Sequence, residues 1–170
     1  MRLTTRGRYA VMAMAELAAR TLANPESRPV TLAEIAARQG LSLSYLEQLF
    51  GRLRRAGLVT SVRGPGGGYR LAFPPSETRI SDIILAADEP IRATRCTVGS
   101  PKGCLGGQAR CLTHDLWEEL GNQIHLFLAS VSLEDVVKKR VLGRAGLLHA
   151  TLRQVEGPTV DGKEHDLAAE

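Results

Sequence analysis

The 170-residue chain has few aromatic residues, three cysteines in all and no lysine before residue 74. Its aromatic content is 4%, and its apolar residues are mostly alanine, leucine and valine, which favours closely packed helices over a large sheet. No apolar run reaches the roughly 18 residues that a membrane span needs, and the first residues do not form the apolar core of a signal peptide. We therefore expect a mainly α protein that stays in the cytoplasm.

The positive charge is concentrated in the first half of the chain. Residues 1–73 hold eleven arginines against four glutamates, a surplus of +7, whereas residues 74–170 hold eleven basic and fourteen acidic residues. Arginine suits bidentate contacts to phosphate or guanine, although an ordinary solvated basic surface explains the same excess. The first half is therefore the candidate for binding a polyanion.

Two helices are predicted before the main amphipathic one. The threonines at positions 4 and 5 can cap a first helix, whose apolar residues recur at helical spacing until about Arg20. After a loop with two prolines, Thr31 and Glu34 form the capping-box pattern that opens a second helix, which runs to Gln39. Gly40 supplies the left-handed residue that ends it.

The third helix is predicted to begin at Ser42 or Ser44 and to run to about Ala56. Its apolar residues recur at helical spacing, and its short connection to the second helix predicts a helix-turn-helix unit. The N-terminal end of such a helix meets base edges and needs short polar groups, while cations farther along meet phosphates. The residues of this helix predicted to contact DNA are Ser42, Ser44, Tyr45, Glu47, Gln48 and Arg52.

Glu47 has two interpretations. Its carboxylate can accept a hydrogen bond from cytosine N4 while it repels phosphates, which would make Glu47 a specificity filter and not an affinity group. Ser44 and Glu47 also match a capping box, a structural role that needs no DNA. The sequence leaves both interpretations open.

A β-hairpin is predicted directly after the helix-turn-helix unit. Residues 58–63 alternate like a strand, a Gly-Pro-Gly-Gly-Gly turn follows, and residues 69–72 return as a second strand. A hairpin in this position is the wing of a winged-helix domain, and its flanking arginines can straddle or enter the minor groove. The wing residues predicted to contact DNA are Arg63, Gly64, Pro65, Gly66 and Gly67, and Arg2, Arg6 and Arg8 near the N-terminus are predicted to add phosphate contacts.

Three further helices are expected in the second half. Ser81 is predicted to cap a short helix over residues 82–87 that packs onto the winged domain. The longest helical pattern runs over Thr113–Val131, with a wide apolar stripe. Ser132 then caps a short helix that runs to Arg140.

All three cysteines lie in the glycine-rich segment between the short helix predicted over residues 82–87 and the long helix predicted over Thr113–Val131. Cys96, Cys104 and Cys111 are separated by seven and six residues, and His114 follows Cys111 after two more. Structural disulfides are disfavoured in the cytosol, so a metal site explains the cysteines better than disulfides do. Zinc sites usually contain a Cys-x-x-Cys clip, which this chain lacks, so the spacing favours an iron-sulfur cluster. The fourth ligand is His114, a carboxylate or a group from another subunit.

Four strings carry a resemblance to a known family: Met1–Thr4, Leu41–Phe50, Val62–Tyr69 and Cys111–Trp117. Over about residues 1–140 the chain resembles the IscR family of winged-helix regulators, which implies repression or activation of cluster-assembly genes from a pseudo-palindromic operator in double-stranded DNA. The resemblance implies a homodimer joined through the long helix, and it places Glu47 and Arg63 among the DNA-contacting residues. It also implies a 2Fe-2S cluster held by Cys96, Cys104, Cys111 and His114.

The predicted elements divide the chain into four parts. These are a winged helix-turn-helix DNA-binding domain (1–90), a cluster-binding loop (91–111), a dimerisation helix with the short helix after it (112–140) and a tail predicted to be disordered (141–170). The intervals between the cysteines, around Val98 to Lys102, are longer than is usual in the family. All four candidate ligands are nevertheless present.

Two other interpretations remain open. One is a related regulator that senses nitric oxide through a similar three-cysteine site, and the other is a DNA-binding or scaffolding protein with a redox-silent structural zinc ion. An enzyme is not expected, because the sequence shows no nucleophile and base constellation. The turn over residues 64–68 also lacks the Gly-Lys-Ser/Thr ending of a phosphate-binding loop.

Overall fold

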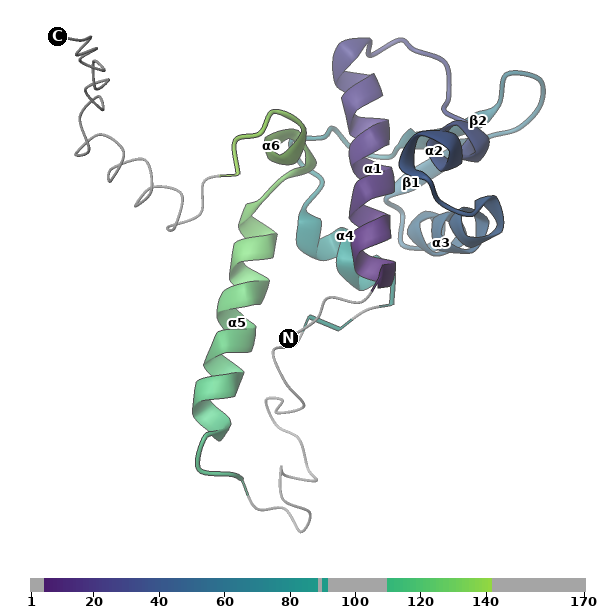
Figure 1. Cartoon of the computed structure of the whole chain (residues 1–170). Helices are drawn as coiled ribbons and strands as arrows, with labels where there is room; N and C mark the ends of the chain where they lie inside the picture. The colour runs from purple at the N-terminus through teal and green to yellow at the C-terminus, as the bar shows by residue number, and fades with distance from the viewer. Residues whose placement is uncertain (1–4, 89, 92–109, 142–170) are drawn as a thin grey trace, which may run out of the picture. The chain divides into compact units, whose positions relative to one another are not determined.

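The computed structural model describes residues 5–88, 90–91 and 110–141. Figure 1 shows the order α1 (Thr5–Ala23), α2 (Leu32–Gln39), α3 (Leu43–Arg55), β1 (Val59–Val62), β2 (Gly68–Leu71), α4 (Ile80–Ala86), α5 (His114–Ser130) and α6 (Leu133–Val137). A helix-turn-helix unit followed at once by a hairpin confirms the predicted mainly α winged-helix fold. The cysteine segment up to residue 109 and the tail from residue 142 lie outside the described residues.

α1 runs three residues beyond its predicted end near Arg20. The backbone hydrogen bond from Asn24 to Arg20 and the one from the Thr21 hydroxyl to the Leu17 carbonyl continue its last turn. α1 ends at Ala23. The next residue, Asn24, precedes Pro25, and the α conformation is disfavoured for a residue that precedes a proline. The proline, and not the last apolar residue of the stripe, therefore sets the end of α1.

The capping box of α2 is confirmed. The Thr31 hydroxyl accepts from the Glu34 amide at 3.3 Å, and the Glu34 carboxylate accepts from the Thr31 amide at 3.0 Å. That backbone hydrogen bond, together with the Arg28 guanidinium, lowers the pKa of Glu34 to about 2. Gly40 ends the helix in the left-handed region with φ 64°, as predicted. These contacts define the two ends of α2.

The hydrophobic core lies between α1, α3 and α4. Phe50 of α3 is fully buried, and its ring meets the ring of Tyr69 in β2 edge to face at 4.9 Å. The other buried apolar residues that α1, α3 and α4 contribute are Ala10, Ala13, Met14, Leu17, Ala18, Leu46, Leu49, Leu53, Ile80, Ile83 and Ile84. The apolar face of α3 is thus held by the core, which leaves its polar face exposed.

The wing is an antiparallel two-stranded sheet in which Val59 pairs with Leu71. Tyr69 also exchanges backbone hydrogen bonds with Val30, at 2.8 and 3.0 Å, so the segment before α2 lies against β2. Gly68, with φ 156°, stands at this crossing, and a Cβ there would lie 2.5 Å from the Val30 carbonyl oxygen. Glycine at this position allows the wing to sit against the helix-turn-helix unit.

α4 starts earlier than the sequence indicated. The structure has Arg79 as its N-cap, and Ser81 lies inside the helix, so the predicted Ser81 cap is wrong. The start is set by a distant segment, because the Ile80 amide donates to the Val131 carbonyl at 3.0 Å. α6 likewise ends at Val137 and not at Arg140, since Lys139 takes a positive φ of 55°. The predicted Ser132 cap of α6 is confirmed as a capping box with Asp135.

α5 covers the predicted long helix to within one residue at each end. In Figure 1 it extends away from the winged domain, and it contacts α4. None of the helices in the described ranges is long and apolar enough to cross a membrane.

Candidate nucleic-acid interface and metal centre

The N-terminal end of α3 presents polar side chains to solvent. Ser42 is the N-cap residue, and its hydroxyl lies 2.9 Å from that of Ser44. Ser42, Ser44, Glu47 and Gln48 are all exposed, while Tyr45 is half-buried and its ring contacts that of Tyr9 edge to face at 5.9 Å. This end of the helix therefore matches the predicted arrangement of short polar groups over an apolar base.

The structure does not support the capping-box interpretation of Glu47. The helix begins at Leu43 with Ser42 as its cap, and no side chain makes the capping hydrogen bond. Ser44 is then inside the first turn and cannot be the partner that a capping box requires. Glu47 makes no side-chain hydrogen bond or ion pair within the described part of the chain. Its carboxylate is therefore available for an outside partner.

Arg6 of α1 lies beside the outer face of α3. A small hollow of about 60 Å³ is lined by Arg6, Tyr45, Gln48, Leu49 and Arg52. The fold thus places one of the predicted N-terminal arginines next to the predicted base-contacting residues. Arg8 lines a different groove, and Arg2 is outside the described residues.

Asp88, just beyond α4, is a charged neighbour of this surface that sequence reasoning missed. Its Oδ2 atom lies 2.9 Å from Nη1 of Arg52 and 3.8 Å from Nη1 of Arg6. Asp88 and Arg52 are 36 residues apart, so no local pattern announces the pair. Asp88 has φ 62°, a left-handed geometry that Asp and Asn tolerate better than most residues.

The tip of the wing is exposed from Arg63 through Gly66. Its turn is closed by a hydrogen bond from the Gly67 amide to the Gly64 carbonyl at 2.9 Å. Gly64 and Gly66 both take positive φ, which explains the glycines without invoking DNA. Arg63, directly after β1, is the side chain of this tip that can bind phosphate or enter a minor groove.

Two of the four predicted metal ligands are described, and they share one turn. The His114 amide donates to the Cys111 carbonyl at 3.0 Å, and the Cys111 Sγ atom lies 3.7 Å from the Thr113 hydroxyl. His114 is 3% exposed although it opens a helix. Cys96 and Cys104 lie outside the described residues.

Two carboxylates of α5 lie close to the His114 imidazole. Its Nε2 atom lies 3.1 Å from Oε2 of Glu118, one turn further along the helix. Ligand atoms of His114, Asp115 and Glu118 all lie within 4.8 Å of one another. The i, i+4 spacing of His114 and Glu118 was a sequence signal that could have identified Glu118.

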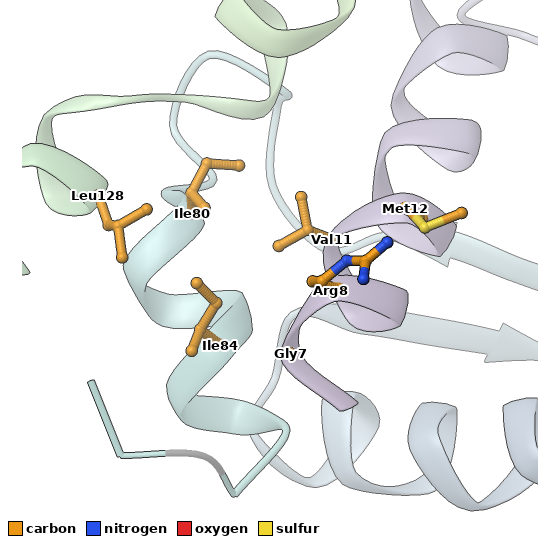
Figure 2. Close-up of a pocket in the computed structure, with 7 residues that line it drawn as sticks. All are labelled: Gly7, Arg8, Val11, Met12, Ile80, Ile84 and Leu128. Atoms are coloured by element: carbon orange, nitrogen blue, oxygen red, sulfur yellow. The ribbon is translucent and has the colours of Figure 1, made fainter. Parts of the chain in front are cut away.

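α5 carries an exposed apolar stripe. Leu116, Leu120 and Phe127 recur on one side of the helix, with exposed fractions of 61%, 40% and 43%. Next to α5 runs an apolar groove of about 370 Å³, shown in Figure 2. Its lining comes from α1, α4 and α5 and consists of Gly7, Arg8, Val11, Met12, Ile80, Ile84 and Leu128.

Comparison with known proteins gives consistent matches over most of the chain. The model of the Rrf2 family, described as an iron-dependent transcriptional regulator, matches residues 3–139. The HTH-type transcriptional regulator IscR of Photorhabdus laumondii is 54% identical over 147 residues, which cover 86% of this chain and 85% of that protein.

Two solved structures have the same fold. T. potens IscR aligns with a TM-score of 0.62 and 36% identity, covering 85% of this chain and 90% of that one. CymR, the global cysteine regulator of B. subtilis, aligns with a TM-score of 0.67 and 32% identity, covering 82% and 98%. Since proteins named for different regulatory roles share the fold, the fold alone does not identify the signal.

Proposed function

This chain belongs to the Rrf2 family of transcriptional regulators, and on that premise we propose that it is a cytoplasmic, homodimeric regulator that senses an iron-sulfur cluster. Membership of the family implies DNA binding and agrees with the expectation that the chain is not an enzyme. The observation that carries the proposal furthest is the joint presence of an outward polar α3 and, on α5, a buried histidine one turn from a cysteine.

For DNA recognition, we assign base contacts to the N-terminal half of α3. The exposed Ser42, Ser44 and Gln48 can donate to or accept from base edges, and the unengaged carboxylate of Glu47 can select cytosine N4. Arg6 and Arg52 lie beside these residues and suit phosphate, while Arg63 extends the contact to a neighbouring groove. Arg2, Arg8, Gly64, Pro65, Gly66 and Gly67 complete the proposed contact set.

For the cluster, we assign Cys96, Cys104, Cys111 and His114 as ligands. The described half of this set fits: a thiol and an imidazole on one turn are ligands that a 2Fe-2S cluster accepts. The cluster would supply a redox- and oxygen-sensitive group. The chain's own part is to hold His114 in a buried position, where its backbone is fixed by the start of α5.

The experiment that tests the cluster is the visible absorption spectrum of the full chain purified without oxygen, with iron, acid-labile sulfide and zinc measured on the same sample. We expect charge-transfer bands with about equal iron and sulfide. Cys111→Ala should lose both, and Asn122→Ala, an exposed substitution elsewhere on α5, should keep them. A colourless wild-type protein free of sulfide would refute the iron-sulfur assignment.

A structural zinc ion is the second candidate, and one observation favours it. The grouping of His114, Asp115 and Glu118 offers an imidazole and two carboxylates, which zinc binds readily. Zinc in a colourless protein, lost on Glu118→Gln, would establish this alternative. The DNA-binding assignment would stand in either case.

For the dimer, we propose that the occupant of the apolar surface of α5 is a second copy of α5. A helix of 17 residues is about 25 Å long and exposes Leu116, Leu120 and Phe127, so two copies can bury these apolar side chains against each other. Leu120→Lys should shift the protein to monomer in sedimentation equilibrium. Asn122→Lys adds the same charge at an exposed polar position and should leave the dimer intact; equal effects of the two would contradict this interface.

A further inference from the structure

We propose that Asp88 is an internal competitor of the DNA backbone, whose carboxylate occupies arginines that DNA phosphates would otherwise bind. This inference rests on the proposed DNA-binding surface and goes beyond it, because it assigns an affinity-setting role to a residue outside the helix-turn-helix unit and the wing. Asp88 lies just after α4, and its carboxylate binds Arg52 of α3 at 2.9 Å and approaches Arg6 of α1 to 3.8 Å.

The position of Arg52 makes this contact relevant to DNA. Arg52 lines the small hollow that also contains Gln48 and Tyr45, and it lines a second hollow of about 550 Å³ on the side of α4. The second hollow is walled by Arg52, Arg55 and Asp88, together with Ala56, Leu85 and Ala86. Among the described residues that line it, two guanidinium groups face one carboxylate, which is an excess of positive charge. A phosphate of the DNA backbone has the charge and the acceptor oxygens to replace Asp88 there.

The exposure of the partners indicates that the contact can be broken. The Asp88 side chain is 80% exposed, whereas that of Arg52 is 32% exposed, so solvent screens the pair and keeps it weak. An exposed pair of this kind changes an equilibrium by less than about fivefold. Asp88 therefore tunes affinity by a modest factor and does not block binding. Its negative charge also stays beside the arriving phosphates and repels them.

The test is the Asp88→Asn variant of the full chain, measured by fluorescence anisotropy on a mixed-sequence 30-base-pair duplex over a range of salt. Asparagine keeps the side-chain shape and tolerates the positive φ of 62°, so the backbone is preserved. We expect about threefold tighter binding at low salt. The slope of log affinity against log salt should steepen by about 0.9 for each phosphate contact that the freed arginine gains.

Two controls identify the cause. Glu77→Gln makes the same change in net charge at an exposed position whose side chain has no hydrogen bond or ion pair in the described ranges, and it should leave affinity unchanged. In an Arg52→Gln background, Asp88→Asn should lose most of its effect, because the arginine that it releases is gone.

Three outcomes would contradict the proposal that Asp88 competes with DNA phosphates for Arg52. If wild type binds duplex DNA but Asp88→Asn binds equally or more weakly with an unchanged slope, Asp88 merely positions Arg52 and the inference is wrong. If Glu77→Gln tightens binding as much as Asp88→Asn, general charge explains the effect and the inference is again wrong. If wild type shows no salt-dependent binding, the proposed function fails together with the inference.

Discussion

Replacing Glu34 by glutamine tests how the helix-turn-helix unit is held. The Glu34 carboxylate accepts from the Thr31 amide, and its other oxygen binds Arg28 at 2.5 Å. Glutamine can keep the capping hydrogen bond with its side-chain carbonyl but loses the charge. The variant therefore isolates the ionic part of the interaction from the capping part.

The pKa of Glu34 sets the size of the expected effect. A shift from 4.5 to about 2 corresponds to at most about 3.4 kcal/mol of stabilisation at neutral pH. The Glu34 side chain is 28% exposed and that of Arg28 is 60% exposed, so solvent reduces this figure. Since glutamine also retains part of the cap, we expect Glu34→Gln to lose about 1 to 2 kcal/mol at pH 7.

The pH dependence has a definite sign. Because folding lowers the pKa of Glu34, its contribution is fully present above about pH 4.5 and is lost as the pH falls toward 2. Urea unfolding followed by circular dichroism, at fixed protein concentration from pH 7 to 3.5, should show the two proteins converging on acidification. Glu77→Gln serves as the control. A difference that stays constant with pH would refute the ionic explanation.

Three further substitutions, the first with a matched control, separate stability from recognition. Gly68→Ala places a Cβ 2.5 Å from the Val30 carbonyl oxygen and should lower the free energy of unfolding by about 1 to 3 kcal/mol, measured by thermal unfolding. Gly51→Ala, with open space around it in α3, is the control and should be neutral or stabilising. Equal effects of the two would contradict the close contact at Gly68. Arg63→Ala should weaken binding to every duplex and flatten the salt slope by about 0.9 per lost phosphate contact, and anisotropy over several sequences checks this. Glu47→Ala should broaden the sequences recovered from a random duplex pool with little loss of affinity, and a uniform loss across sequences would argue against the specificity role.

Helix ends that depend on residues close in the sequence could be predicted to within about one residue. The capping box of Thr31 and Glu34 and the left-handed Gly40 are short-range signals, and both are found as expected. The start of α4 could not be predicted in this way. It depends on the hydrogen bond from Ile80 to Val131, which comes from the far side of the cysteine segment, and this bond overrides the local preference for a serine cap.

The candidate site was predictable to a similar degree. Residues of α3 fall on its exposed face because the core fixes the opposite face, and this follows from periodicity alone. Asp88 could not be found, because its role depends on the tertiary packing of α4 against α3. Glu118 is intermediate in predictability. Its i, i+4 spacing from His114 can be found in the sequence, but the burial of the His114 imidazole beside it is seen only in the structure.

The apolar stripe of α5 shows most clearly where sequence reasoning ends. The pattern predicted a helix with a wide apolar face, and the structure divides that face in two. Leu128 packs against the core beside α4, whereas Leu116, Leu120 and Phe127 remain exposed. Periodicity shows on which side of a helix an apolar residue lies. It does not show whether the surface that covers this residue belongs to the same chain. The exposed half of the stripe is therefore information that only the packed chain provides, and the proposed dimer of α5 helices rests on this half.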